Sequence, residues 1–337
     1  MLLKQVFVMP EALNYPNCHE ILARLEEKQL SIELLKSNRM PKSISKDPQQ
    51  MFLGAKRTLV LAVRKKSAFQ SCRPSSDYQL PLVSGCPGLC HYCYLNTNFG
   101  PNPYVRVYVN IAEIFEWAEE YITQRQPLTT MFEGSATSDP VPVEGWTQSL
   151  AKTIEYFANH PYGRFRFVTK FDTVDSLLKI NHKNHTQVRF TLNTERVIKY
   201  WDTGTPGLDR RLAAAEKIAL AGYPYGFLIG PIITYDNWQR DYRELIQIIA
   251  AKVPPTTVKQ LSFELITHRF TPRAKKQILQ VYPETDLDLD ETQRVWKYGQ
   301  FGYGKWVYPP ATYATIQEVL VPEIHRYLPQ ATIMYLV

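Results

Sequence analysis

Three cysteines lie close together in the segment SGCPGLCHYCYLNT, which spans residues 84–97. Cys86, Cys90 and Cys93 form a C-x3-C-x2-C pattern. Thiolates are soft ligands that select iron–sulfur clusters or zinc. Three thiolates on one loop can bind three irons of a 4Fe–4S cubane and leave the fourth iron open to a substrate or cosubstrate. The pattern therefore predicts a 4Fe–4S cluster held by these three residues.

Zinc is the alternative occupant of this loop. A structural zinc site is closed by four ligands, usually with paired C-x2-C spacing. His91 is the candidate for the fourth ligand, but it adjoins Cys90 and points elsewhere in most loop geometries. The other two cysteines, Cys18 and Cys72, are scattered, and an odd count is a poor disulfide framework. We expect them to be free thiols.

The elements that must position this loop are short strands alternating with amphipathic helices. The expected strands are rich in β-branched and aromatic residues and are bounded by turn formers. They are Thr58–Val63, Gln79–Val83, Thr129–Glu133, Arg164–Thr169, Gln187–Leu192, Tyr225–Gly230 and Gln260–Leu265. Helices are expected near residues 19–36, 111–124, 207–222, 236–251 and 312–327, the second with a capping box from Asn110 to Glu113. Such alternation predicts a parallel sheet, either barrel-like or doubly wound.

Polar residues stand at or just beyond the ends of several of these strands. Ser138 follows the strand that ends near Glu133, and Lys170 follows Arg164–Thr169. Thr191 and Asn193 close the strand Gln187–Leu192. In barrel enzymes the carboxyl ends of the strands form the active-site face. Strand-end capping is the ordinary explanation for any one of these residues alone.

The composition is that of a globular protein. The 337 residues are 45% hydrophobic and 21% charged, enough for a sizeable core without disulfides. The sequence contains no run of 18 apolar residues, and its first residues lack the features of a signal peptide. We therefore expect a cytoplasmic protein with no membrane partner. The formal charge of +7 permits a polyanionic partner without requiring one.

Several sequence blocks resemble the spore photoproduct lyase family of the radical S-adenosylmethionine (SAM) superfamily. The cluster motif has Tyr92 in the aromatic position of that superfamily. The resemblance covers nearly the whole chain. Its further blocks are KRTLVLAVRKKSAFQSCRPSSDYQLPL, FEGSATSDP, RFRFVTKFD, AGYPYGFLIGPI, SFELITHRFT and YGQFGYGKWVY.

The resemblance implies an α/β fold: a partial (β/α)6 TIM-type barrel with an N-terminal α/β extension and a C-terminal β-hairpin. The extension is expected over residues 1–75, the barrel over residues 76–337, and the hairpin over about 297–308. It also implies a 4Fe–4S cluster and SAM as cofactors. Ser138, Lys170 and Thr191, with Asn193 beside them, would hold the SAM.

The implied activity is repair of the spore photoproduct, a thymine dimer, by a 5′-deoxyadenosyl radical. Resemblance places Tyr94 in the relay that regenerates this radical, and Tyr92 either joins it or packs over the cluster. The family's final hydrogen donor is a cysteine, and its position here is Ala136. A methyl group cannot serve, because its C–H bond is far stronger than a thiol S–H bond. We therefore predict SAM cleavage with a defective last step. Either Ala136 is an engineered substitution, or the chain is a natural homologue that uses Tyr94 or Tyr92 as the donor or has lost turnover.

The implied partner is double-stranded DNA carrying the lesion, in the spore core of a spore-forming bacterium. Basic side chains position DNA through its phosphates, and a hairpin could hold a flipped lesion. The candidate contacts are His268, Arg269, Tyr303 and Lys305, and a basic run lies before the cluster loop at Lys56, Arg57, Arg64, Lys65, Lys66 and Arg73. A monomer and an electron donor such as flavodoxin or ferredoxin complete the expectation.

Two other functions stay open. One is a catalytically silent iron–sulfur protein that binds damaged DNA, which Ala136 keeps in view. The other is a radical SAM enzyme with a substrate other than DNA. The basic and aromatic features argue against the second, and the intact three-cysteine loop argues against the first.

Overall fold

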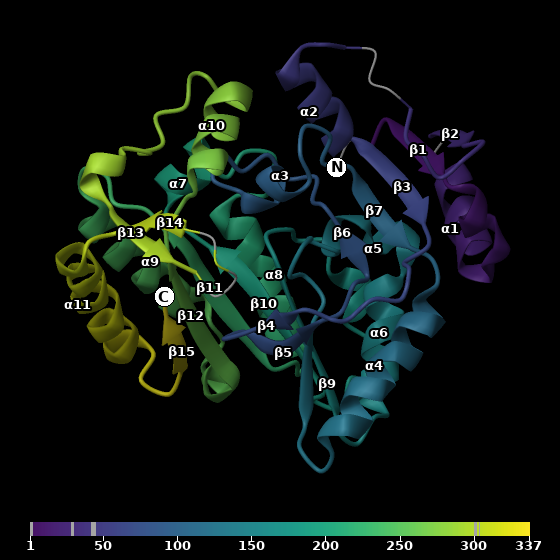
Figure 1. Ribbon diagram of the computed structural model, residues 1–337. Coiled ribbons are helices and arrows are strands. Elements are labelled where there is room, and N and C mark those ends of the chain that lie inside the picture. The colour runs from purple at the N-terminus through teal and green to yellow at the C-terminus, as the bar shows by residue number, and fades with distance from the viewer. Residues whose placement is uncertain (1–2, 28–29, 42–44, 300–301, 303) are drawn as a thin grey trace. The chain divides into compact units, whose positions relative to one another are not determined.

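The computed structural model describes residues 3–27, 30–41, 45–299, 302 and 304–337 (Figure 1). Its contacts divide the chain into two compact units. The first unit comprises residues 1–87, 98–169 and 173–186, and the second comprises residues 88–97, 170–172 and 187–337. The boundary expected after residue 75 separates an N-terminal extension from a barrel, and the division into contact units does not test it. That boundary stays a prediction.

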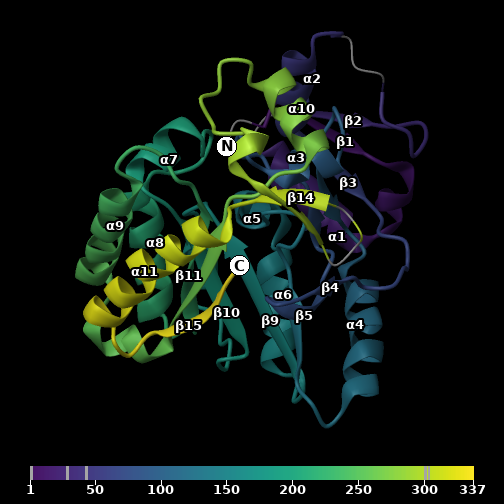
Figure 2. The ribbon, with the colours of Figure 1, turned by 60° about the vertical axis from the view of Figure 1, so that its left-hand side comes forward.

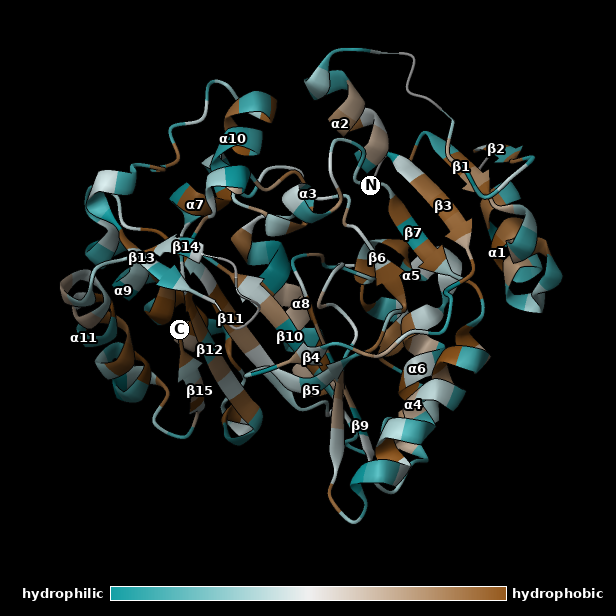
Figure 3. Ribbon diagram, viewed as in Figure 1, coloured by the Kyte–Doolittle hydropathy of each residue, from teal (hydrophilic) through white to brown (hydrophobic). Residues whose placement is uncertain are grey.

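The first unit contains a largely parallel sheet near the N-terminus. Its order is β2-β1-β3-β7-β6, and only the short β6 runs antiparallel to its neighbour. The buried β3 carries leucine and valine and is largely brown in Figure 3. The strands are β1 (Gln5–Val8), β2 (Ser31–Leu34), β3 (Thr58–Ala62), β6 (Val83–Ser84) and β7 (Val105–Tyr108).

A second group of strands in this unit has the order β4-β5-β8-β9. The strands β5, β8 and β9 are parallel, and β4 pairs with β5 in the antiparallel sense. They are β4 (Ser71–Cys72), β5 (Ser76–Gln79), β8 (Thr130–Glu133) and β9 (Gly163–Thr169). The helices of the unit are α1 (Pro16–Glu26), α2 (Pro48–Lys56), α4 (Ile111–Arg125), α5 (Val141–Thr147) and α6 (Ser149–Ala158). Of these, α4 packs on β8 and α6 on β9.

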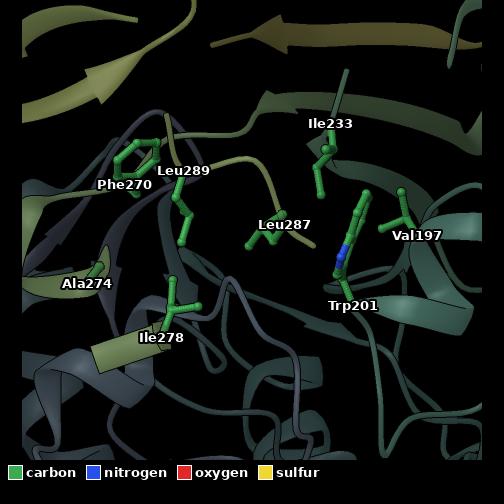
Figure 4. Close-up of a cluster of buried hydrophobic side chains, with 8 residues drawn as sticks. All are labelled: Val197, Trp201, Ile233, Phe270, Ala274, Ile278, Leu287 and Leu289. Carbon is green, nitrogen blue, oxygen red and sulfur yellow. The ribbon is translucent and has the colours of Figure 1, made fainter. Parts of the chain in front are cut away.

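The second unit repeats the strand–helix alternation. Its parallel strands have the order β10-β11-β12-β15, and α9 and α11 lie side by side (Figure 2). The strands are β10 (Thr186–Leu192), β11 (Tyr225–Ile232), β12 (Leu261–Thr267) and β15 (Thr332–Leu336). The helices are α7 (Glu195–Tyr200), α8 (Leu208–Leu220), α9 (Trp238–Lys252), α10 (Pro272–Val281) and α11 (Pro310–Tyr327). A buried apolar cluster joins α7 and α10 to the loop at Leu287 and Leu289 (Figure 4).

The C-terminal hairpin is present close to its expected place. It pairs β13 (Val295–Tyr298) with β14 (Gly304–Val307), with Trp296 opposite Trp306 and Lys297 opposite Lys305. Every residue of β13 is exposed. Tyr303, a predicted contact, lies outside the described residues.

Most expected strands are confirmed within one or two residues, but three expectations are wrong. Gln79–Val83 is not one strand: β5 ends at Gln79 and β6 begins at Val83, because Pro81 between them has no N–H to donate. The helix expected over residues 19–36 ends at Glu26, and Ser31–Leu34 pairs with β1. Asn110 does not cap α4 through its side chain, which instead bonds the backbone of Arg64.

Within the described residues, no helix is long and apolar enough to cross a membrane.

Candidate active site

The cluster loop begins with a glycine that no other residue could replace without strain. Gly85 has a φ of +80°, and a Cβ built there would lie 2.3 Å from the carbonyl oxygen of Tyr104. Its N–H donates to the carbonyl of Thr137 at 2.9 Å, and it forms a bridge with Ser138. Gly85 is therefore held against the loop that follows β8, and Cys86 is the next residue in the chain.

The side chain of Lys56 holds the backbone of Cys86 in place. Its side chain is 1% exposed, and its Nζ donates to the Cys86 carbonyl at 2.8 Å. The ammonium also lies 5.2 Å from the ring centroid of Phe52. Lys56, named in the basic run before the cluster loop as a candidate DNA contact, is therefore turned inward by α2.

In the second unit, Cys90 lies in a buried polar environment. Cys90 is 6% exposed, and burial raises the pKa of its thiol to about 12, with Lys170 opposing the rise. The Lys170 Nζ lies 3.6 Å from the Cys90 Sγ, donates to Asp202 at 2.7 Å and makes a short hydrogen bond to the Tyr92 hydroxyl. A thiol with so high a pKa becomes a thiolate only when a metal or a cation compensates the charge. The Lys170 ammonium is the cation that lies beside this thiol.

His91 is turned away from a ligand role. Its Nδ1 is hydrogen bonded to the Thr285 hydroxyl at 2.8 Å, and its ring stacks on Tyr282 with the centroids 4.0 Å apart. This placement argues against His91 as the fourth ligand of a zinc site. Among the described residues, no group of three or more His, Cys, Asp and Glu side chains is placed so that it could hold a metal ion. The cluster ligands therefore stay assigned by the motif.

The predicted SAM residues have distinct environments. In the first unit Ser138 is buried, and its hydroxyl donates to the Gly134 carbonyl at 3.4 Å. In the second unit Thr191 is buried near the end of β10, where its carbonyl accepts from Arg211 at 2.9 Å. Asn193 is engaged by protein groups: its amide donates to the Pro231 carbonyl and accepts from the Tyr242 hydroxyl. A cofactor role for Asn193 would require one of these bonds to open.

The residues predicted for the radical relay also differ in exposure. Tyr94 begins α3 (Tyr94–Asn98) and is 57% exposed, whereas Tyr92 is half-buried beneath the Lys170 ammonium, 4.6 Å from its ring centroid. Ala136 is half-buried in the loop after β8. Next to it, Ser135 donates to the Glu133 carboxylate at 2.5 Å, and Ser75 donates to the same carboxylate at 2.9 Å.

Sequence reasoning missed Asp202, Arg211 and Glu133, which are buried charged residues that contact several predicted site residues or their neighbours. Asp202 and Arg211 stand alone in the sequence, without a motif, and Glu133 lies in the block FEGSATSDP, where it marks only the end of an expected strand. The available signal was a charged residue inside or beside an otherwise apolar element, which is rare unless the charge is paired.

Among the predicted DNA contacts, Arg269 is exposed and Lys305 is half-buried on β14. His268 is 1% exposed, and neither ring nitrogen has a hydrogen-bond partner. Its carbonyl accepts from Arg294 at 3.2 Å. A direct contact between His268 and a substrate therefore requires the substrate to enter the interior, and this assignment stays a prediction.

The buried His268 should make the protein less stable in acid. Burial and the nearby Arg294 lower its pKa from 6.5 to about 3. The unfolded chain therefore takes up a proton below pH 6.5 while the folded chain does not, so stability falls as pH decreases between these values. The loss should reach about 2 kcal/mol between pH 7 and pH 5. Urea unfolding at both pH values measures it.

His268→Gln should flatten this part of the pH dependence. His19→Gln is the matched control, because His19 is exposed, and it should leave the dependence as it was. An equally steep loss in His268→Gln would assign the acid sensitivity to another group.

The comparisons with known proteins place this site in a family. The family model described as "Spore photoproduct lyase" matches residues 2–337. The chain belongs to the spore photoproduct lyase family. It is 44% identical over 334 residues to the spore photoproduct lyase of Clostridium acetobutylicum, covering 99% of this chain and 98% of that one. It is 41% identical over 331 residues to that of Bacillus subtilis, covering 98% and 97%.

Solved spore photoproduct lyase structures share the fold. One, in complex with dinucleoside spore photoproduct, has a TM-score of 0.96 at 42% identity and covers 99% of this chain and 98% of that one. Another has a TM-score of 0.95 with the same identity and coverage. It is a cysteine-to-alanine and serine-to-cysteine variant with bound AdoMet and dinucleoside spore photoproduct. The expected α/β partial barrel of the radical SAM kind is therefore confirmed.

Proposed function

We propose that this chain repairs the spore photoproduct, splitting the thymine dimer back into two thymines by radical SAM chemistry. The observation that carries the proposal is the full-length match to the lyase family together with an intact C-x3-C-x2-C loop. The lyase family is a radical SAM family, so a 4Fe–4S cluster and SAM are the implied cofactors. Repair of DNA damage in the cytoplasm of the spore follows from the same proposal.

In this proposal, Cys86, Cys90 and Cys93 hold the cluster, and Ser138, Lys170, Thr191 and Asn193 hold SAM. When bound, these cofactors supply the 5′-deoxyadenosyl radical that takes a hydrogen atom from the lesion. The chain's own residues bind, orient and exclude water. Lys170 supports this assignment, because its half-buried ammonium lies beside Cys90 and can pair with the carboxylate of SAM.

The proposed substrate is the lesion in double-stranded DNA. A solved relative holds dinucleoside spore photoproduct, which is the reacting part of such a substrate. The hairpin offers Lys297 and Lys305 side by side, with the exposed rings of Trp296 and Tyr298 on β13. Cations and aromatic rings of this kind suit phosphates and unstacked bases. Action as a monomer and an electron donor such as flavodoxin or ferredoxin complete the proposal.

The last step has two candidate forms. Ala136 cannot donate a hydrogen atom, which favours a defective step. Spacing favours another donor, Cys72. In the doubly substituted relative, the altered serine and cysteine lie 64 positions apart, as Cys72 and Ala136 do here. A tyrosine replaced by phenylalanine in another variant lies 42 positions before that cysteine, as Tyr94 lies before Ala136. Cys72 therefore corresponds to the position where that variant gains a cysteine.

The contacts within the first unit agree with this second form. Cys72 ends β4, which pairs with β5, and β5 pairs with β8 directly before the Ala136 loop. Ser75, three residues after Cys72, and Ser135, next to Ala136, donate to the same Glu133 carboxylate. The segments that carry Cys72 and Ala136 are thus tied to one side chain. We therefore favour Cys72 as the hydrogen donor over a defective last step.

One assay tests the proposed function. The chain is reconstituted with iron and sulfide without oxygen, then given reductant, SAM and a spore-photoproduct dinucleotide, and 5′-deoxyadenosine and thymine are followed together. Both products are expected. Deoxyadenosine with little thymine would support the defective last step. Absence of deoxyadenosine from a chain that still binds lesion DNA would indicate the silent iron–sulfur protein instead.

A further inference from the structure

A short segment after α7 is hydrogen bonded to the cluster loop on both sides of Cys90. The His91 N–H donates to the Trp201 carbonyl at 2.9 Å, and the Leu89 N–H donates to the Thr203 carbonyl at 2.9 Å. The Thr203 hydroxyl returns a bond to the Leu89 carbonyl at 2.8 Å. Cys90 therefore lies opposite Asp202, and the Cys90 thiol is hydrogen bonded to the Asp202 carboxyl group.

The neighbour of Asp202 is anchored in the apolar core. Trp201 packs in the cluster with Val197, Ile233 and Leu287 (Figure 4). Its indole N–H donates to the Asp286 carboxylate at 2.7 Å. Because the apolar core holds Trp201, the backbone of the next residue, Asp202, is fixed as well. Its position is set by packing rather than by the cofactors.

Asp202 is paired with two cations, of which Arg211 is buried with it and Lys170 is half-buried. One carboxylate oxygen accepts from Lys170 at 2.7 Å, and the other accepts from Arg211 at 3.0 Å. The side chains of Asp202 and Arg211 are 0% exposed. A buried ion pair is weak evidence for stability, since desolvation offsets its attraction. A role in positioning is therefore the more informative explanation.

Arg211 extends this arrangement to β10. Its guanidinium donates to the carbonyl of Thr191 at 2.9 Å and to that of Pro206 at 2.8 Å. It also donates to the Thr205 hydroxyl at 2.7 Å, which in turn donates to the Asp202 carbonyl at 2.5 Å. The Arg211 guanidinium thus fixes the end of β10 at Thr191. It also fixes the Asp202 carboxylate, which in turn holds Lys170.

We propose that Asp202 and Arg211 are a positioning pair that holds Cys90, Lys170 and Thr191 in register for the cluster and SAM. The inference rests on the proposed function, which assigns those three residues to the cofactors. With Lys170 and Arg211 cationic and Asp202 anionic, the group carries one net positive charge beside Cys90. That charge balances the thiolate that the cluster requires. Removing the carboxylate frees Lys170 from its fixed position.

Asp202→Asn tests the pair through SAM binding. Reconstituted protein is dialysed against radiolabelled SAM, and iron content and thermal midpoint are measured on the same sample. Loss of a residue that orients a metal or cofactor ligand typically costs about 10–100-fold in affinity. We expect SAM to bind at least about tenfold more weakly, with less iron retained per chain. In a Lys170→Met background, Asp202→Asn should add little, because the carboxylate acts through Lys170.

Glu264→Gln is the matched control. Glu264 pairs with Arg189 at 2.7 Å, and both side chains are 1% exposed in the same unit. It should lower the thermal midpoint as Asp202→Asn does but leave SAM affinity unchanged. Equal SAM affinity in Asp202→Asn and the unaltered chain would overturn the inference. Failure of the unaltered chain to bind SAM would reject the proposed function, and the cofactor role of the pair with it.

If Asp202→Asn does not accumulate as folded protein, Thr205→Val tests the same arrangement from outside the ion pair. Thr205 bridges the Asp202 carbonyl and the Arg211 guanidinium, and it is only half-buried. Its loss should weaken SAM binding several-fold with little change in the thermal midpoint. An unchanged SAM affinity in this folded variant would count against the pair.

Discussion

Replacing Cys90 with alanine should abolish cluster binding and, with it, the cleavage of SAM. Three cysteines are the minimum that can hold a cubane with one open iron, so the two remaining thiolates cannot retain it. Cys90 is also the buried member of the loop, and it lies 3.6 Å from the Lys170 ammonium. We expect iron per chain to fall to background and 5′-deoxyadenosine formation to fall at least about a thousandfold, as for groups that act as a unit.

Cys18→Ala is the control for this experiment. Cys18 is also a buried thiol, but it lies in α1, where burial raises its pKa to about 11 and no functional role is assigned to it. Its loss should cost some stability and leave iron content and SAM cleavage as they were. Retention of a full cluster in Cys90→Ala would show that the loop is not the ligand set. Zinc in place of iron in the unaltered protein would support the alternative of a closed, four-ligand zinc site.

The strands that carry the site could be predicted because their signal is local. The strand Tyr225–Ile232 is a largely apolar run, and its own eight residues are enough to recognise it. The same holds for the cysteine motif, whose three ligands lie on one loop. Prediction went wrong where a local pattern was ambiguous, as at Ser31–Leu34, whose pairing partner β1 lies at the other end of α1.

The residues around the ligands could not be predicted, because their partners are distant in sequence. Asp202 meets Lys170 and Cys90 only after β10 and α7 have been placed. Its own neighbourhood, WDTGTPG, reads as a turn, for which an aspartate is ordinary. Charge pairing across a fold leaves no periodic trace in the sequence, so a buried ion pair is found only in three dimensions.

Cys72 illustrates the same limit at the hydrogen-donor position. From sequence, no route connects Cys72 with Ala136, since 64 positions separate them. The strand order β4-β5-β8 places the strand that ends at Cys72 and the strand that precedes the Ala136 loop on either side of β5 in one sheet. Under the proposal that Cys72 is the hydrogen donor, the thiol is relocated from one segment to the other rather than lost.

Replacing Cys72 with serine should uncouple lesion opening from thymine recovery. A thiol S–H bond is weak enough to give its hydrogen atom to a thymine radical, whereas the O–H bond of a serine of nearly the same size is too strong. With the cluster loop untouched, 5′-deoxyadenosine should still form with the dinucleotide present. Thymine recovery should fall at least about a hundredfold, or close to 3 kcal/mol in the barrier of that step.

Adding Ala136→Cys to Cys72→Ser completes the test. If the donor has moved between these two segments of one sheet, a thiol at residue 136 should restore thymine recovery while residue 72 stays a serine. The hypothesis of a defective last step makes the opposite prediction: the unaltered chain would already recover little thymine, and Cys72→Ser would change nothing. Because both variants are scored by the ratio of thymine to 5′-deoxyadenosine, a general loss of folded protein affects both products and leaves the ratio intact.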